Sequence, residues 1–372
     1  MAISVVQFKP RPMEEVRAEL LGRAKNMRNP FFYSVYEEVR PVINRLRSVD
    51  REEWAQAFGA LAGPYEERAA KAEAAGDGGA AMSCYLIAYD YYHLARYPVP
   101  NSPGKLKAYR KSQENYLHAA RYFDPPLERV EMPFRGRPGE GTVSVGYLRK
   151  PKSFEKPPVM ILWGGIDAFK EERKSEPFLE AGIATLSIDM PGVADAPLAG
   201  SEDGERLWDA VLDWIDGRAD LDSRRVGILG GSTGGYWATK VAHTHRERIR
   251  AAVNQGGPAH FAFASDWIAK AQRGEYPFEL AETLASAFGR STAQEWVEYS
   301  PRLSLLDQGI LDRPCAPLLC LDGLDDSVFP IADMYLLLQH GGPKSIRLFP
   351  GGHMGGRQAL SVTLPWLIQH LI

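Results

Sequence analysis

The chain has 372 residues, of which 45% are hydrophobic and 24% charged, an ordinary composition for a folded protein with a sizeable core. Its formal net charge of −3 favours neither a nucleic acid nor a membrane surface as a partner. The three cysteines, Cys84, Cys315 and Cys320, match neither a disulfide framework nor a zinc pattern, and neither a leader-like N-terminus nor a long apolar stretch is evident. We therefore expect a cytoplasmic protein.

The first third of the chain has a helical texture. Apolar residues recur at helical spacing from residue 14, residues 66–75 are rich in helix formers, and residues 80–96 and 106–123 continue the pattern around glycine and proline breaks. The prolines that follow Asp124 end this part. We predict an all-helical cap or lid domain over residues 1–126.

Strands are predicted after this point. A hairpin is expected over 127–148, with its turn at 135–139. Further strands are predicted at 159–162, 184–188, 226–229, 251–253, 317–321 and 346–349, most of them separated by helical segments. This alternation predicts an α/β domain over 127–372 with a mostly parallel sheet flanked by helices. Residues 258–306 have no strand pattern, so we expect a helical insertion at the rim of the sheet.

The most informative segment follows the strand at 226–229. The sequence Gly230-Gly231-Ser232-Thr233-Gly234 places a G-x-S-x-G pattern between a strand and a helix, which predicts an exposed nucleophilic serine at position 232. The backbone N–H of Thr233 would then face a developing oxyanion. A glycine-rich turn that serves packing alone is the alternative. A phosphate site fits less well, because the loop lacks the lysine of a P-loop.

A nucleophilic serine needs a base and a carboxylate that orients it. His353 lies between glycines after the last predicted strand, where open α/β sheets place their sites, and is our candidate for the base. His260, at the start of the insertion, is a minor candidate. In the acidic turn after the strand at 317–321 we favour Asp326 over Asp325 and expect a structural role for Asp322. The chain order Ser, Asp, His is that of hydrolases.

A second glycine-rich strand end could complete the site. In Trp163-Gly164-Gly165-Ile166-Asp167 the glycines would let backbone N–H groups approach a substrate oxygen, so Gly165 or Ile166 could give a second oxyanion donor. A plain turn is the alternative.

Aromatic residues suggest a substrate wall. Tyr85, Tyr89 and Tyr92 share one face of a predicted helix, although packing of that helix on the rest of the protein is the favoured explanation. Trp267, Tyr276, Phe278 and Phe288 in the insertion could line the opposite wall. The residues that we predict to contact substrate are Trp163, Asp167, Tyr89, Tyr92, His260 and Trp267.

Together these segments resemble the α/β-hydrolase fold over residues 127–372. The Gly164-Gly165-Ile166-Asp167 segment, with Lys170-Glu171-Glu172 and the serine turn, resembles a branch with a helical N-terminal domain. That branch includes FrsA-like esterases, 2,6-dihydroxypseudooxynicotine hydrolase and fungal hydrolases that shorten polyketides. Its Gly-x-x-Asp-x-x-x-Pro pattern falls on Gly323, Asp326 and Pro330, and Trp163 stands where lipases of another branch carry histidine.

The resemblance implies a Ser–Asp–His triad that hydrolyses an ester or a carbon–carbon bond beside a ketone (EC 3.1.1 or 3.7.1 type). If the aromatic residues named above line the pocket, they favour a medium-sized aromatic or polyketide-like small molecule as the substrate. The resemblance also implies a homodimer. We expect no metal and no other cofactor. Two alternatives stay open: an acyltransferase, which would use another acceptor than water, and a non-catalytic binding or regulatory protein on the same fold.

Overall fold

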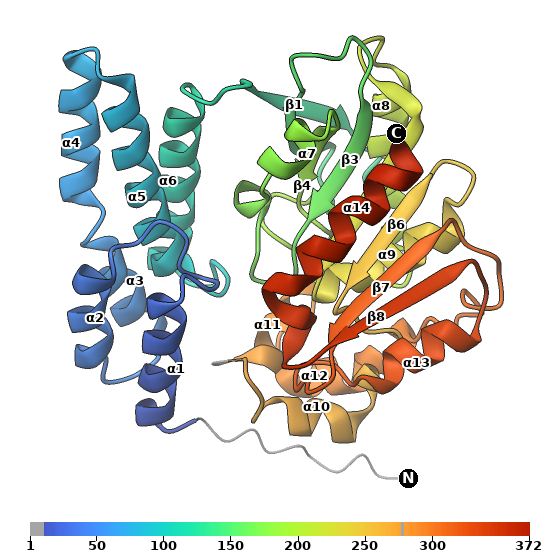
Figure 1. Cartoon of the computed structure of the whole chain (residues 1–372). Coiled ribbons are helices and arrows are strands. Elements are labelled where there is room, and N and C mark those ends of the chain that lie inside the picture. Colours follow the sequence, from blue (N-terminus) through green and yellow to red (C-terminus); the bar gives the residue numbers. More distant parts are fainter. Residues whose placement is uncertain (1–10, 277–278) are drawn as a thin grey trace. The chain divides into compact units, whose positions relative to one another are not determined.

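The computed structural model describes residues 11–276 and 279–372 (Figure 1). The chain divides into two compact units, one ending at Leu127 and the other running from Glu128 to Ile372. The first unit is helical and the second is an α/β unit.

The helical unit is built around its longest helix, α5, which contacts α3, α4 and α6. Asp50, Asp77 and Ser102 cap α3, α5 and α6 by accepting backbone N–H groups of the first turn. The buried carboxylate of Asp90 accepts three backbone N–H groups from the loop before α2. The helices are α1 (Met13–Lys25), α2 (Tyr36–Arg45), α3 (Arg51–Gly59), α4 (Gly63–Ala74), α5 (Gly78–Arg96) and α6 (Pro103–Ala120). The predicted helical texture of this region is confirmed.

The second unit contains an eight-stranded sheet in the order β1-β2-β4-β3-β5-β6-β7-β8. Strand β2 pairs antiparallel with β4, and every pairing from β4 to β8 is parallel. The strands are β1 (Leu127–Pro133), β2 (Val143–Arg149), β3 (Pro158–Trp163), β4 (Ala184–Ile188), β5 (Asp222–Gly231), β6 (Ala251–Gln255), β7 (Leu318–Gly323) and β8 (Lys344–Phe349). All eight predicted strands are present. Strands β3, β4 and β7 are buried along their whole length, and strands covered on both faces read as continuous apolar runs.

Helices cover both faces of the sheet (Figure 1). On one face, Phe178 of α7 (Glu176–Glu180) and Leu367 and Leu371 of α14 (Ala359–Leu371) pack on residues of β3, β6 and β7. On the other face lie α8 (Leu207–Asp216) and α9 (Thr233–Thr244), whose Trp208 and Trp237 rings lie 5.8 Å apart in a tilted arrangement. Helix α13 (Ala332–Gln339) contacts β7 and β8.

Between β6 and β7 the described residues form helices and loops but no strand, as predicted for 258–306. Its start is fixed by Asp333 of α13, whose carboxylate accepts the backbone N–H groups of four consecutive residues, 259–262. Its helices are η3 (Phe261–Phe263), α10 (Ser265–Ala271), α11 (Leu280–Ala287), α12 (Ala293–Tyr299) and η4 (Ser300–Leu303). The remaining short helices of the unit are η1 (Lys170–Glu172), η2 (Gly204–Arg206) and η5 (His353–Gln358).

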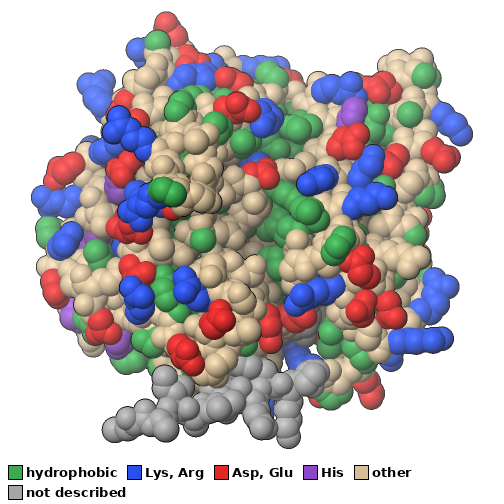
Figure 2. All heavy atoms as spheres, turned by 180° about the vertical axis from the view of Figure 1, so that it is seen from behind, with side chains coloured by type: hydrophobic (Ala, Val, Ile, Leu, Met, Phe, Trp, Pro, Cys, Tyr) green, Lys and Arg blue, Asp and Glu red, His purple; other side chains and the backbone are tan. Residues whose placement is uncertain are grey.

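The surface is electrostatically mixed. On the face drawn in Figure 2, basic and acidic side chains of the described residues are interspersed, and no continuous basic stretch is visible on that face. Among the described helices, none combines the length and the apolar character that crossing a membrane requires.

Candidate active site

Ser232 lies at the sharp turn between β5 and α9. Its backbone has φ 54° and ψ −132°, a conformation that is strained for a residue with a side chain. The turn is held by the N–H of Ser232, which donates to the carbonyl of Gln255 on β6 at 2.8 Å. The serine side chain is half-buried at the carboxyl edge of the parallel strands.

The glycines around this turn are required by close approach. A Cβ on Gly230 would lie 2.1 Å from the carbonyl oxygen of Gly234, and a Cβ on Gly234 would lie 2.2 Å from that of Gly164. The indole N–H of Trp163 donates to the same Gly234 carbonyl at 2.9 Å. The ends of β3 and β5 are therefore locked together at the serine turn.

The structure brings Ser232, His353 and Asp326 together. The Oγ of Ser232 lies 2.8 Å from Nε2 of His353, and Nδ1 of His353 lies 2.6 Å from Oδ2 of Asp326. The other carboxylate oxygen of Asp326 accepts the backbone N–H groups of Val328 at 2.6 Å and Phe329 at 3.0 Å. With Nδ1 protonated toward the carboxylate, Nε2 is free to accept the serine proton. Asp325, the second candidate, has an exposed side chain outside these bonds.

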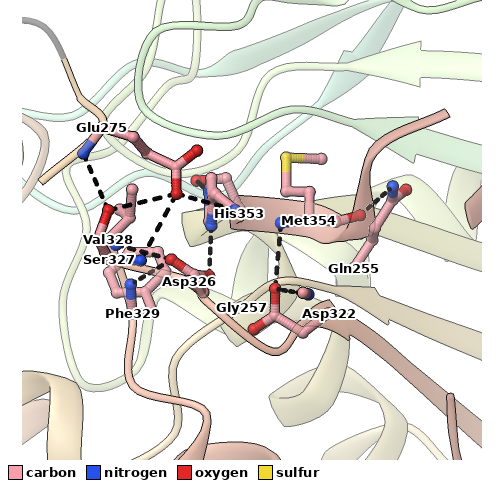
Figure 3. A network of polar contacts seen from close by, with 12 residues as sticks. Gln255, Gly257, Glu275, Asp322, Asp326, Ser327, Val328, Phe329, His353 and Met354 are labelled. Atoms are coloured by element: carbon pink, nitrogen blue, oxygen red, sulfur yellow. Dashed lines mark hydrogen bonds and ion pairs between the residues drawn. The ribbon is translucent and has the colours of Figure 1, made fainter. Parts of the chain in front are cut away.

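The histidine loop is fastened on both sides (Figure 3). Oε1 of Glu275, from the insertion, accepts the backbone N–H of His353 at 2.9 Å and the hydroxyl of Ser327 at 3.3 Å. The side chain of Gln255 donates to the carbonyl of Met354 at 3.1 Å. Glu275 thus joins the loop that carries His353 to the loop that carries Asp326.

The pKa shifts of His353 and Asp326 agree with their pairing. Burial alone would lower the pKa of His353, but the facing carboxylate of Asp326, helped by Glu275, raises it to about 9. Burial likewise opposes ionisation of Asp326, yet the imidazole of His353 and two backbone N–H groups hold the pKa of that carboxyl below its ordinary value. The pair is arranged to carry opposite charges.

The second glycine-rich loop lies directly beside the serine. A Cβ on Gly165 would lie 2.8 Å from Cβ and 3.1 Å from Oγ of Ser232. In the described part of the chain, the backbone N–H groups of Thr233, Gly165 and Ile166 donate to no protein acceptor. Such unoccupied donors next to a hydroxyl can receive the negative charge of a tetrahedral intermediate.

A buried ionic cluster fixes the chain that follows this loop. Nζ of Lys170 is fully buried and lies 2.8 Å from Asp189, 2.6 Å from Asp195 and 3.3 Å from Glu171. The backbone N–H of Lys170 also donates to Asp189 at 2.9 Å. Burial is the main cause that raises the pKa of Asp189, to about 6, so its carboxylate depends on the lysine charge.

Lys170→Met will destabilise the protein by about 3–5 kcal/mol, because it leaves buried carboxylates without their cation. Urea denaturation of the full chain at pH 7 measures this loss. Lys174→Met, at an exposed site in the same segment, is the matched control. Equal midpoints for the two variants would contradict a structural role of the cluster.

Two of the residues predicted to contact substrate, Trp163 and His260, have their contacts elsewhere. The prediction for Trp163 needs correction: its side chain is fully buried and its ring packs 4.7 Å from that of Trp208, so it supports the serine turn from inside. The ring of His260 lies 2.6 Å from Ser304 Oγ and 3.8 Å from Asp307, so its polar contacts lie away from the triad.

Other predicted contacts stay predictions. The indole of Trp267 donates to the carbonyl of Val328 at 3.0 Å, next to the loop of Asp326, and Asp167 is nearly buried in the loop after β3. In the helical unit, Tyr89 packs against Tyr116, and the hydroxyl of Tyr92 bonds Glu66 at 3.0 Å. Phe278 lies outside the described residues.

Sequence reasoning missed one acidic residue of the site. Glu275 has no motif, because its partners lie 52 and 78 positions away. Asp322, for which we expect a structural role, lies in the triad cluster: a carboxylate oxygen of Asp322, one of Asp326 and a ring nitrogen of His353 all lie within 4.8 Å of one another. This is the one such cluster among the described residues. Because His353 and Asp326 already bond each other there, we assign no metal to it.

Comparison with known proteins identifies the family of the chain. The model of the family described as "Esterase FrsA-like" matches residues 51–371. The alpha/beta hydrolase ucsC of an Acremonium species is 31% identical over 247 residues, which cover 58% of this chain and 49% of that protein. Esterase FrsA of Vibrio parahaemolyticus is 27% identical over 294 residues, which cover 76% of this chain and 68% of that protein. The chain thus spans only about half the length of the fungal relative.

Solved structures share the fold over nearly the whole chain. A 2,6-dihydroxy-pseudo-oxynicotine hydrolase superposes with a TM-score of 0.75 and 23% identity, over 96% of this chain and 95% of that one. AbyA5 superposes with a TM-score of 0.71 and 23% identity, over 96% of this chain and 93% of that one. The predicted α/β-hydrolase fold is confirmed, and the chain belongs to the FrsA-like esterase family.

Proposed function

We propose that this protein is a serine hydrolase that cleaves an ester, or a carbon–carbon bond beside a ketone, in a medium-sized small molecule. The observation that carries the proposal is the continuous chain of contacts from Ser232 Oγ through His353 to Asp326, at 2.8 and 2.6 Å. Membership of an esterase family supports the same conclusion.

The proposed reaction begins when His353 takes the proton of Ser232 as the hydroxyl oxygen attacks a carbonyl carbon. The negative charge that forms on the carbonyl oxygen is received by the backbone N–H of Thr233 and by that of Gly165 or Ile166. Asp326 stabilises the imidazolium and holds its tautomer. The tetrahedral intermediate collapses, and His353 returns the proton to the leaving group. Water then cleaves the acyl-enzyme by the same steps.

The leaving group decides between the two reactions. An ester leaves as an alkoxide that takes one proton from His353. A carbon leaving group takes the same proton, but its electron pair must first be delocalised into a second carbonyl of the substrate, as in a β-diketone. The triad serves both cases, so the substrate supplies the difference.

A substrate panel tests the proposal. The purified full chain is incubated with aryl esters of increasing acyl length and with aryl β-diketones, with and without added alcohols and amines. We expect carboxylic acid to be released from at least one class. Transfer to the added acceptor in preference to water would instead indicate an acyltransferase, and no turnover of any class would favour a binding protein.

The rate of hydrolysis should depend on pH through His353. Since only the neutral imidazole can take the serine proton, and its pKa is raised to about 9, kcat/KM should rise with pH along a limb well above 6.5. Asp326→Asn removes the carboxylate that raises this pKa and should move the limb of its residual activity to lower pH. A wild-type limb at or below pH 6.5 would contradict the assignment.

Gly165→Ala should lower kcat by about 10²–10³-fold, because its new Cβ collides with Ser232 and displaces an oxyanion donor. Steady-state kinetics on the best substrate of the panel measures this effect. Gly217→Ala is the control, since the nearest atom to its Cβ lies at an ordinary 3.5 Å. Circular dichroism must show both variants folded; equal kcat values would refute the role of this loop.

Other expectations also stand as proposals. A cytoplasmic location is suggested by three cysteines that form no disulfide among themselves. A homodimer is suggested by the resemblance alone, and the molar mass in solution tests it. A preference for aryl over alkyl substrates tests the prediction that aromatic side chains contact the substrate.

A further inference from the structure

Asp322 is a second carboxyl group beneath the catalytic pair. It is the next-to-last residue of β7 and is completely buried. Its Oδ1 accepts the backbone N–H of Gly323 at 2.8 Å and that of Met354 at 3.0 Å, so it ties β7 to the histidine loop (Figure 3). One oxygen of this side chain is therefore fully explained by backbone contacts.

The second carboxylate oxygen of Asp322 lacks such contacts. Oδ2 of Asp322 is buried and has no hydrogen-bond partner among the described residues. A carboxylate oxygen of Asp326 and a ring nitrogen of His353 lie within 4.8 Å of a carboxylate oxygen of Asp322. Asp322 forms no ion pair with a described Lys or Arg. Two buried carboxylates at such a distance cannot both be ionised cheaply, since like charges repel and burial removes their solvation.

The neighbouring strands offer no compensating charge, and the imidazole of His353 already pairs with Asp326. On the adjacent strands the residues paired with this part of β7 are Leu348 on β8 and Gln255 on β6, both uncharged. The ionisable groups that face Asp322 are Asp326 and His353, with Glu275 behind the histidine and Cys320 on the same strand. A proton on Oδ2 would satisfy the orphaned oxygen by turning it into a donor.

We propose that Asp322 keeps its proton at neutral pH and donates it to the carboxylate of Asp326, so that the two carboxyl groups share one negative charge opposite His353. Asp322 is then a positioning residue: it holds Asp326 in place from below and touches neither substrate nor the reacting atoms. The effect of Asp322 on catalysis rests on the proposed function, whereas the presence of a proton on Asp322 is independent of it.

Titration behaviour supports this arrangement. Burial, followed by the charge of Asp326, raises the pKa of Asp322 to about 8. An unfolded aspartate loses its proton near pH 3.9. The folded state therefore binds one more proton than the unfolded state between these values, and this group makes the protein less stable as pH rises from about 4 to about 8.

Infrared spectroscopy of wild type and Asp322→Asn tests the protonation directly. At a pH below about 8 the wild type should show the C=O stretch of a protonated carboxylic acid that the variant lacks, and the difference should vanish above that pH. Other buried carboxyls, such as Asp90 and Asp333, contribute equally to both proteins and cancel. Superimposable spectra at neutral pH would overturn the proposal. If the variant fails to fold, the pH dependence of the wild-type band decides.

Stability gives a second readout. The urea midpoint of Asp322→Asn relative to wild type should increase steadily from pH 5 to about 8 and then level off, because the amide cannot ionise. A difference that stays constant over this range would mean that Asp322 is an ordinary carboxylate.

The kcat values of two variants show whether Asp322 positions Asp326 through a hydrogen bond or only fills space. Asp322→Leu keeps the branched shape of the side chain but neither donates nor accepts a hydrogen bond, and should lower kcat by about tenfold or more, the value of one hydrogen bond to a charged group. Asp322→Asn can donate to Asp326 while its carbonyl accepts from Gly323 and Met354, and should recover most of that loss. Equal kcat values for the two variants would reject the positioning role. If neither Ser232 nor Asp322 affects activity but the infrared band is present, the proposed function fails and the shared proton stands.

Discussion

Ser232→Ala is expected to lower kcat for the best ester or β-diketone substrate by about 10⁴–10⁶-fold, the range seen when a serine nucleophile is removed. The physical reason is that no other hydroxyl lies 2.8 Å from Nε2 of His353 among the described residues. The residual rate reflects binding and the oxyanion donors alone. Steady-state and single-turnover kinetics measure the loss, since they separate chemistry from product release.

Ser361→Ala is the matched control, because this serine is exposed on α14 and its hydroxyl bonds only the carbonyl of Gln358. It should match wild type in rate and in urea midpoint. If Ser232→Ala retained more than about a tenth of the wild-type kcat while folded, Ser232 would not be the nucleophile.

Asp326→Asn should have the second largest effect, a loss in kcat of about 10⁴-fold. The amide keeps the shape of the side chain, but its NH₂ group can face Nδ1 of His353, which then favours the tautomer that cannot accept the serine proton. It also removes the charge that stabilises the imidazolium. The effect should appear in kcat more than in KM, because the carboxylate does not touch the substrate.

Asp325→Asn provides the control one position away. Its side chain is exposed and its backbone N–H, which donates to the carbonyl of Gly351 at 2.9 Å, is unchanged by the substitution. The pair of variants therefore separates the two aspartates that the sequence left open. A larger loss from Asp325→Asn than from Asp326→Asn would contradict the geometry.

The sequence predicts most of the sheet because a buried strand appears as a run of neighbouring apolar residues. Strands such as β3, β4 and β7 are buried along their whole length and read as uninterrupted apolar runs. The ends of a strand are harder to predict where they carry no apolar residues. Strand β5 extends from Asp222 to Gly231, beyond the apolar run at 226–229. The sequence does not indicate these ends, because the first residues of β5 are polar and its last are glycines.

The proposed site is predictable for a different reason. Ser232 follows from a local pattern of glycines that close approach requires, and the positions of Asp326 and His353 follow from chain order in a parallel sheet. Contacts between distant segments leave no such pattern. The links of Glu275 to His353 and of Lys170 to Asp189 depend on tertiary structure alone.

Trp163 shows where a local reading fails. An aromatic residue at the carboxyl end of a strand can point toward a site or into a face of the sheet, and the sequence does not decide which. Here the indole fills the layer between β3 and α8 and gives its N–H to the serine turn. The same ambiguity remains for the tyrosines of α5, where packing and substrate contact predict the same helix face.

The central claim is that Ser232 is activated by His353, and covalent labelling tests it most directly. Wild type, Ser232→Ala and His353→Ala are incubated with a fluorophosphonate and analysed by intact mass and peptide mapping. The account predicts one adduct on Ser232 in wild type, no adduct in Ser232→Ala, and strongly slowed labelling in His353→Ala. Folded wild type that takes up no label, or label on a residue other than Ser232, would contradict it.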